Sequence, residues 1–232
     1  MQEQKYAIKD WAKDDQPREK LLMLGAPRLS NAELLAILIR KGNRQKNALE
    51  LAQDVMRLAK DNVAGLGKLT ISDITHGTGL GQVAAMSLIA ALELGRRRQV
   101  AELEPGGEKR VKSSRDAAEW LQIKLKDLTH EVFGLLLLNR ANKIIRFEII
   151  SEGGITATIA DPRVIFKKAL TGNATSMILC HNHPSGNLKP SRADEELTQK
   201  LVQAAGLLDI RVIDHLIVSD SGYYSFADEG LI

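Results

Sequence analysis

Residues 176–194, with the sequence SMILCHNHPSGNLKPSRAD, decide the fold of the second half of this chain. The apolar run at 176–180 predicts a short buried strand that ends in histidines. The Pro-Ser-Gly sequence at 184–186 predicts a sharp turn, and Ser191 begins a helical pattern that Gly206 ends. A buried strand followed by a turn and a helix is typical of an α/β unit.

The histidines at the end of this strand form a candidate metal site with residues of the helix. His181 and His183 are two residues apart, so on an extended backbone their side chains point to the same face. Asp194 lies in the first helical turn and can face back toward them. Two imidazoles and one carboxylate leave a fourth tetrahedral position open, as catalytic zinc requires. We therefore predict a site for one zinc ion per chain.

A simpler interpretation of the same helix start stays open at this point. Ser191 and Asp194 have the spacing of a helix cap, because serine is a preferred N-cap and an acid in the first turn suits the helix dipole. The two interpretations are compatible, since one serine can both cap the helix and lie beside a metal ion. The nearby pair of histidines favours the metal site.

Sequence patterns along the whole chain predict two domains. Residues 1–103 have a helical pattern, and residues 104–114 combine Pro, Gly and alternating charge, which is typical of an interdomain linker. In residues 115–232, two apolar runs flank the turn-like sequence Arg-Ala-Asn-Lys and predict a pair of adjacent strands. Strands mixed with helices predict an α/β or α+β sandwich for this part.

Local signals in the first domain predict where its helices begin and end. Ser30 with Glu33 and Asn47 with Glu50 have the spacing of capping boxes, which mark helix N-termini. Gly42 follows the first of these helical patterns and is placed to end that helix.

The amino-acid composition excludes some classes of protein and some types of metal site. The chain has 232 residues and a single cysteine, Cys180. It therefore has no internal disulfide and no thiolate zinc cluster, and any metal must be held by His and carboxylate groups. We interpret Cys180 as a buried, unreactive thiol, because alternation points it away from His181. The charged N-terminus and the lack of an apolar run of membrane-spanning length predict a cytoplasmic protein without membrane contact.

The Gly79-Leu80-Gly81 sequence is similar to the turn of a helix-hairpin-helix motif. Such a turn binds a DNA backbone through amides at a helix N-terminus. This chain has Gln82 and Val83 where DNA-binding versions commonly carry a basic residue, and its formal net charge is only +3. Weak DNA binding by Gly79 and Gly81 and helix packing without DNA are both open interpretations.

The spacing of His181, His183, Ser191 and Asp194 resembles the signature of the JAMM, or MPN-plus, metalloproteases. With the flanking sequences DPRVIFKKAL, IDHLIVS and YYSF, and with PREKLLMLGA, LSNAELLAILIRKG and ALELGRR upstream, the chain resembles the bacterial RadC family from about Pro17 to its C-terminus. The resemblance implies a JAMM-like, cytidine-deaminase-like sandwich after the helical domain. It also implies hydrolysis of peptide or isopeptide bonds in a protein substrate.

The resemblance assigns roles to residues of the candidate site. It implies Zn²⁺ on His181, His183 and Asp194, and a stabilising contact from Ser191 to the oxyanion. It also implies a glutamate acid/base at the start of an apolar strand, which is the place of Glu131 in this chain. Without the resemblance, Glu131 would be interpreted as a polar strand entrance.

Three further residues near these motifs have simpler interpretations. Glu148 lies inside an apolar run and suits the solvated face of a strand, and Glu152 precedes two glycines and suits a turn. His215 either supports a metal ligand or is a core histidine, and the sequence favours the core.

The sequence leaves two hypotheses for the function. The protein is either a zinc-dependent peptidase or isopeptidase, or a DNA-associated accessory protein of repair or recombination whose zinc site is structural or idle.

Overall fold

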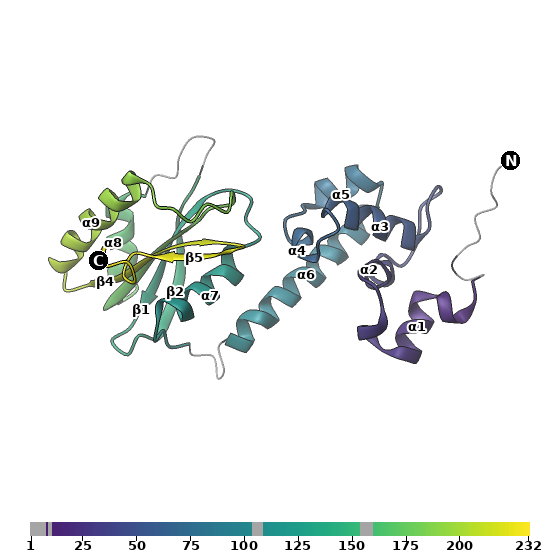
Figure 1. The fold of residues 1–232 in the computed structure, drawn as a ribbon, viewed down its shortest axis with the longest axis horizontal. Coiled ribbons are helices and arrows are strands. Elements are labelled where there is room, and N and C mark those ends of the chain that lie inside the picture. The colour runs from purple at the N-terminus through teal and green to yellow at the C-terminus, as the bar shows by residue number, and fades with distance from the viewer. Residues whose placement is uncertain (1–7, 9–10, 104–108, 154–159) are drawn as a thin grey trace. The chain divides into compact units, whose positions relative to one another are not determined.

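The chain divides into two compact units, Met1–Gly95 and Arg96–Ile232. The computed structural model describes residues 8, 11–103, 109–153 and 160–232. The first unit is helical, and the second contains a five-stranded sheet with helices (Figure 1). This confirms the fold class expected from the sequence.

Four short helices of the first unit, which begin at Asn31, Ala48, Val63 and Ile71, start at side-chain caps. In both predicted capping boxes, Ser30 with Glu33 and Asn47 with Glu50, the side chain of each residue bonds the backbone N–H of the other. The helices are α1 Pro17–Leu24, α2 Asn31–Ile39, α3 Ala48–Leu58, α4 Val63–Leu66, α5 Ile71–Thr78 and α6 Gln82–Leu103, with short 3-10 turns at Lys13–Asp15 and Ala26–Arg28.

The end of α2 differs from the sequence prediction. The helix ends at Ile39, and Arg40 after it has a positive φ of 70°. Gly42 has a different role, because a Cβ atom there would lie 2.2 Å from the carbonyl oxygen of Lys46. Its lack of a side chain allows a close backbone approach within the loop that leads to α3.

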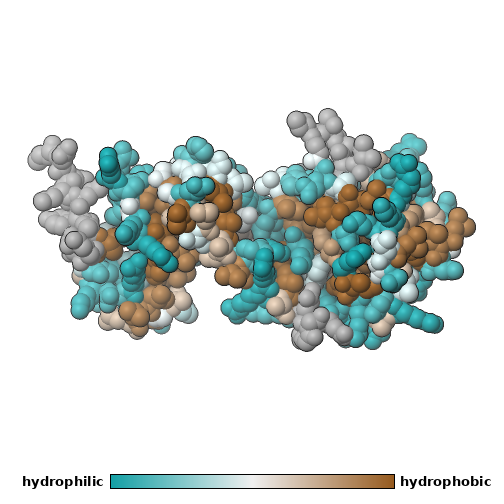
Figure 2. All heavy atoms as spheres, turned by 180° about the vertical axis from the view of Figure 1, so that it is seen from behind, coloured by the Kyte–Doolittle hydropathy of each residue, from teal (hydrophilic) through white to brown (hydrophobic). Residues whose placement is uncertain are grey.

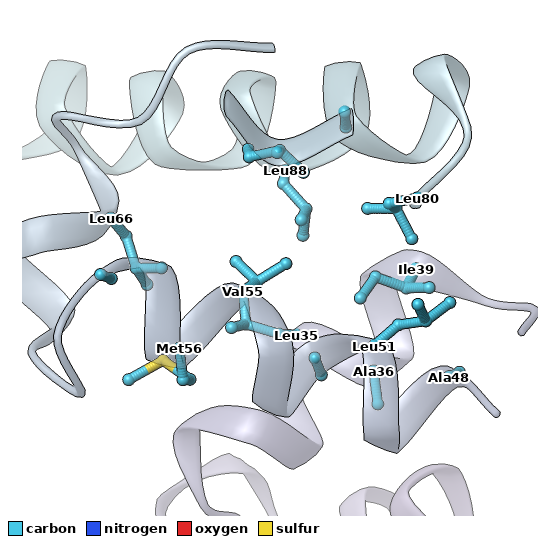
Figure 3. Packing of buried hydrophobic residues seen from close by; sticks show 14 residues of the cluster. Leu35, Ala36, Ile39, Ala48, Leu51, Val55, Met56, Leu66, Leu80 and Leu88 are labelled. Carbon is cyan, nitrogen blue, oxygen red and sulfur yellow. The ribbon is translucent and has the colours of Figure 1, made fainter. Parts of the chain in front are cut away.

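The core of the first unit lies where α3 meets α2 and α6. Leu88 of α6 points toward Val55 of α3, and Leu80 points toward Ile39 at the end of α2 (Figure 3). These four side chains are almost completely buried. The short helices of this unit are therefore held by packing of their apolar faces, since helices of this length are marginal alone.

The surface of both units mixes polar and apolar side chains (Figure 2). The longest helix, α6, has 22 residues but carries charged residues in its second half. None of the described helices combines the length and the apolar content that crossing a bilayer requires.

The second unit has a mixed sheet in the order β2-β1-β3-β4-β5. The strand β1 pairs antiparallel with β2 and β3, whereas β3 pairs parallel with β4. The parallel pair needs a crossover connection, which α9 supplies. The elements are α7 Ser114–Leu125, β1 Val132–Leu138, β2 Ile144–Glu152, α8 Pro162–Thr171, β3 Ser176–Asn182, α9 Arg192–Gly206, β4 Arg211–Ser219 and β5 Gly222–Ser225.

Helices cover both faces of this sheet, so its central strands β1 and β3 are buried throughout (Figure 1). One face packs on α7 through Leu121, and Cys180 belongs to this core. The other packs on α8 and α9 through Ile165 and Leu201. The ring of Phe133 on this second face stacks on His181. Cys180 and His181 thus lie on opposite faces, as strand alternation predicts.

The predicted linker falls partly on residues that the structure does not describe. Residues 104–108 lie outside the described residues. Arg110 forms an isolated antiparallel bridge with Lys143, and the Val111 amide donates to the Asn142 carbonyl. The compact units divide earlier, after Gly95 inside α6, and the domain limits from the sequence stay a prediction.

Asp54 on α3 gives the first unit a pH-dependent contribution to stability. Burial acts to raise the pKa of its carboxyl, but hydrogen bonds and charges from Lys46 and Arg57 outweigh burial and hold the pKa below its ordinary 3.8. Because the folded-state pKa is lowered, this stabilisation is present above pH 3.8 and is lost as pH falls through the folded-state value.

We therefore expect Asp54→Asn to lower the free energy of unfolding at pH 7 by about 1.5–3 kcal/mol, the usual range for hydrogen bonds to a charged group. The difference from the wild type should shrink in strongly acidic solution. Urea unfolding followed by circular dichroism across this pH range measures both effects, with Asp14→Asn as an exposed control. A difference that grows on acidification would contradict this role of Asp54.

Candidate metal centre

The candidate metal centre lies where β3 ends and α9 begins. His181 is the penultimate residue of β3, and His183 directly follows the strand. The backbone N–H of His183 donates to the Val218 carbonyl of β4, at 2.9 Å. This bond extends the parallel pairing past the end of β3 and holds the second histidine in line with the first.

The three predicted ligands come together in the folded chain. Nε2 of His181 lies 3.0 Å from Nε2 of His183 and 3.7 Å from Oδ1 of Asp194. The ligand atoms of all three residues lie within 4.8 Å of one another. Two ligand atoms bound to one tetrahedral zinc ion at about 2.0–2.1 Å are roughly 3.3 Å apart. The observed separations are therefore of the size that one small cation requires.

The helix cap and the metal site use different oxygens of Asp194. The backbone N–H of Ser191 and its Oγ both donate to Oδ2 of Asp194, at 2.8 and 2.6 Å. In return, Oγ accepts from the backbone N–H of Asp194 at 3.2 Å. The capping interpretation is correct, and it also orients the carboxylate, because Oδ2 is held by Ser191 while Oδ1 faces His181.

The hydrogen bonds of the two histidines leave a free nitrogen on each ring. Nδ1 of His183 contacts the carbonyl oxygen of Asn187, which can only accept, so this nitrogen carries the proton and Nε2 has the lone pair. Nδ1 of His181 lies 3.0 Å from Nε2 of His215. The Nε2 atoms of His181 and His183 thus face each other inside the site.

Burial keeps the central imidazole neutral. It lowers the pKa of His181 to about 4, against an opposing effect of the Asp194 carboxylate, and the neighbouring His183 lowers it further. The pKa of His215 also lies well below its usual value, because the ring is fully buried and His181 and His183 are close. Neutral imidazole is the form that binds metal.

A metal ion fits this donor set. If both Nε2 atoms carry lone pairs, the two lone pairs 3.0 Å apart would repel each other, and a cation between them would remove that repulsion. The set contains nitrogen and oxygen donors and leaves tetrahedral positions open, which suits zinc in a catalytic type of site. The three residues could therefore hold one metal ion, with both imidazoles binding through Nε2.

The predicted acid/base, Glu131, directly precedes β1 and is exposed. The side chain of Asn182 fixes the backbone on both sides of it. Oδ1 of Asn182 accepts from the Val132 N–H at 2.8 Å, and Nδ2 donates to the His130 carbonyl at 3.0 Å. Since Asn182 lies between the two histidines in sequence, these bonds hold Glu131 next to the end of β3 that carries the ligands.

The other two glutamates are engaged elsewhere. Glu148 forms ion pairs with Arg146 and Lys168, at 2.8 and 3.0 Å. Glu152 pairs with Val132 in the sheet and lies 3.5 Å from the His130 imidazole. Paired residues of antiparallel strands point to the same face, and Val132 belongs to the core beside α7. Glu152 therefore points away from the face that carries His181.

Comparison with known proteins agrees with this architecture. Residues 111–231 match the family described as RadC-like JAB domain, and residues 8–86 match the family described as UPF0758 N-terminal. The chain belongs to the RadC-like JAB family. The RadC resemblance seen in the sequence is thereby confirmed, and the sheet with its flanking helices is the JAB fold.

Relatives match over nearly the whole chain. A UPF0758 protein of Flavobacterium johnsoniae is 46% identical over 97% of this chain and 97% of its own length. A UPF0758 protein of Porphyromonas gingivalis is 43% identical over 97% of this chain and 99% of its own length. One of Trichlorobacter lovleyi is 39% identical over 97% of this chain and 98% of its own. The chain and these relatives therefore share both parts of the molecule.

Asn182 and Thr198 were not assigned from the sequence alone, and the sequence favoured a core role for His215. Asn182 fixes the backbone around Glu131, and His215 and Thr198 continue the hydrogen bonds of His181. His215 is completely buried, so the core interpretation was right. It also contacts a predicted ligand, which is the supporting position that the sequence left open.

The two glycines predicted to contact DNA lie at the turn between α5 and α6. Gly79 ends α5 with φ 71°, and its N–H donates to the Thr75 carbonyl at 3.0 Å. Gly81 directly precedes α6 and lines a cavity of about 260 Å³ together with Arg40 and Lys41. The Gly79 amide is thus engaged within α5, and any phosphate contact would fall at the start of α6.

We expect purified protein to hold close to one zinc ion per chain, as a single four-coordinate site implies. His181→Ala and His183→Ala should each abolish stoichiometric binding, since the two remaining ligands bind weakly. Elemental analysis after gel filtration measures the metal content. His76→Ala, at an exposed histidine of α5, is the matched control. Stoichiometric zinc in both site variants would contradict the assignment.

Proposed function

We propose that this protein is a zinc-dependent metallohydrolase of the peptidase or isopeptidase type. The observation that carries the proposal is the convergence of Nε2 of His181, Nε2 of His183 and Oδ1 of Asp194. When bound there, a zinc ion lowers the pKa of water and polarises a carbonyl group. Membership in the RadC-like JAB family supports the proposal.

Glu131 is the proposed general base and acid. An exposed carboxylate held at the ligand end of β3 can accept a proton from the attacking water and return it to the leaving amine. The Asn182 bonds to Val132 and His130 support this role, because they restrict the backbone that carries Glu131. The ion pairs of Glu148 and the orientation of Glu152 argue against both alternatives.

Ser191 is the proposed donor to the developing oxyanion. Its hydroxyl has one proton, which is directed to Oδ2 of Asp194 at 2.6 Å. Donation to a substrate oxygen therefore requires the hydroxyl to rotate away from the carboxylate. Oδ2 would keep the bond from the Ser191 backbone N–H, so the orientation of Asp194 would survive that rotation. The substrate proposed from the family resemblance is a peptide or protein amide bond.

Glu131→Gln separates metal binding from proton transfer. We expect this variant to keep its zinc, because Glu131 is not a ligand, and to lose about 10²–10⁴-fold in turnover, the usual contribution of a positioned acid/base. Glu152→Gln is the matched control and should retain turnover. A fluorogenic peptide library supplies the assay, restricted to peptides that the wild type cleaves and His181→Ala does not.

Two results would contradict this assignment. Full turnover by Glu131→Gln on such a peptide would remove Glu131 from the mechanism. Equal losses in Glu131→Gln and Glu152→Gln would indicate a general effect of surface charge rather than proton transfer.

DNA association of the first unit is a second candidate function. The exposed residues Arg40 and Lys41 line the cavity at the start of α6, where the helix dipole favours phosphate. We expect weak duplex binding that falls steeply between about 50 and about 200 mM salt and weakens further in Lys41→Glu. Fluorescence anisotropy measures it, with Lys167→Glu on α8 as control. Salt-independent binding, or binding unchanged in Lys41→Glu, would contradict this site.

A further inference from the structure

Thr198 lies one helical turn beyond Asp194 on α9 and is 1% exposed. Its Oγ1 lies 2.6 Å from the Asp194 carbonyl oxygen and also 2.6 Å from Nδ1 of His215. A carbonyl oxygen can only accept, so the single hydroxyl proton must go to Asp194 if both contacts are hydrogen bonds. Toward His215 the hydroxyl oxygen then accepts, and Nδ1 of His215 carries a proton.

The position of the proton on His215 determines which ring nitrogen of the proposed ligand His181 carries a proton. The partners of the two His215 ring nitrogens are uncharged groups, the Thr198 hydroxyl and the His181 imidazole. A neutral imidazole with a proton on Nδ1 accepts through Nε2. Nδ1 of His181, 3.0 Å away, must therefore donate, and the lone pair of His181 is on Nε2.

The His215 ring is fixed in the orientation that this chain of bonds needs. Phe226 stacks on it with ring centroids 4.6 Å apart, and Phe133 packs edge-on at 5.7 Å. The carboxylate of Asp214 accepts from the backbone N–H groups of His215 and Ala227, at 2.7 and 3.1 Å. The Asp214 bonds hold the backbone and the two aromatic rings hold the plane of the imidazole, which presents Nε2 to His181 and Nδ1 to Thr198.

We propose that Thr198 and His215 are positioning residues that hold His181 in the tautomer whose Nε2 is free to bind metal. His183 reaches the same state directly, through the Asn187 carbonyl. The hydroxyl of Thr198 also bonds the backbone of Asp194, so this chain of bonds joins two proposed ligands that lie on different elements. The inference rests on the proposed metal site. It explains why both histidines of that site present an Nε2 lone pair before a metal ion binds.

The first test reads the tautomers directly in metal-free protein. Long-range ¹H–¹⁵N correlation spectra distinguish a protonated Nδ1 from a protonated Nε2, and single substitutions assign the five histidines. We expect protonated Nδ1 in both His181 and His215. A protonated Nε2 in His181 would overturn the inference. Because no metal is present, this result is independent of the proposed hydrolase function.

The second test measures zinc affinity by competition with a chromophoric chelator. Thr198→Val keeps the side-chain shape but removes the hydroxyl, and we expect about 10–100-fold weaker binding, the usual effect of losing an outer-shell partner. Thr198→Ser should restore the affinity, because its hydroxyl can make the same bonds. Thr171→Val removes an exposed helical hydroxyl that donates to the Lys167 carbonyl on α8, and should change nothing.

The outcomes of the two tests distinguish a failure of the positioning roles from a failure of the proposed function. Wild-type affinity in Thr198→Val would overturn the inference, as would equal losses in Thr198→Val and Thr198→Ser. If Thr198→Val does not fold, the wild-type tautomers still decide. Protonated Nδ1 in His181 of a wild-type protein that binds no zinc would contradict the proposed function and leave the positioning roles intact.

Discussion

The close approach of Nε2 of His181 and Nε2 of His183, 3.0 Å apart, is the constraint on which the account of this molecule depends. In the proposed tautomers, hydrogen bonds on the opposite side of each ring direct both lone pairs into the same small space. Burial disfavours protonation of His181. A bound cation would remove the repulsion between the lone pairs, and Oδ1 of Asp194 faces the same space.

The fold produces this arrangement through one strand-helix-strand unit. The strand β3 carries the histidines to the end of the sheet, α9 begins with the capped Asp194, and β4 returns parallel to β3 with His215. Sites in α/β sheets commonly lie at the carboxyl ends of strands, where the following helix also begins. The antiparallel neighbour β1 completes the region, because Asn182 binds the backbone on both sides of Glu131.

The sequence allowed prediction of those parts of the site that depend on local spacing. The two-residue separation of His181 and His183 and the capping box at Ser191 are local features, and both appear in the structure as predicted. Thr198 could not be assigned and His215 was interpreted as a core residue, because their contact with the site depends on the register of β4 and on the side of α9 that packs against it. The end of α2 was mispredicted for a related reason, since Gly42 serves a contact with Lys46 rather than the helix end.

The most direct test of the account is the position of the metal itself. Crystals of the full chain grown with zinc can be measured at wavelengths on either side of the zinc absorption edge, which locates the ion without assumptions about the ligands. We expect one strong anomalous peak bounded by Nε2 of His181, Nε2 of His183 and Oδ1 of Asp194. An empty position there, with zinc bound elsewhere on the chain, would contradict it.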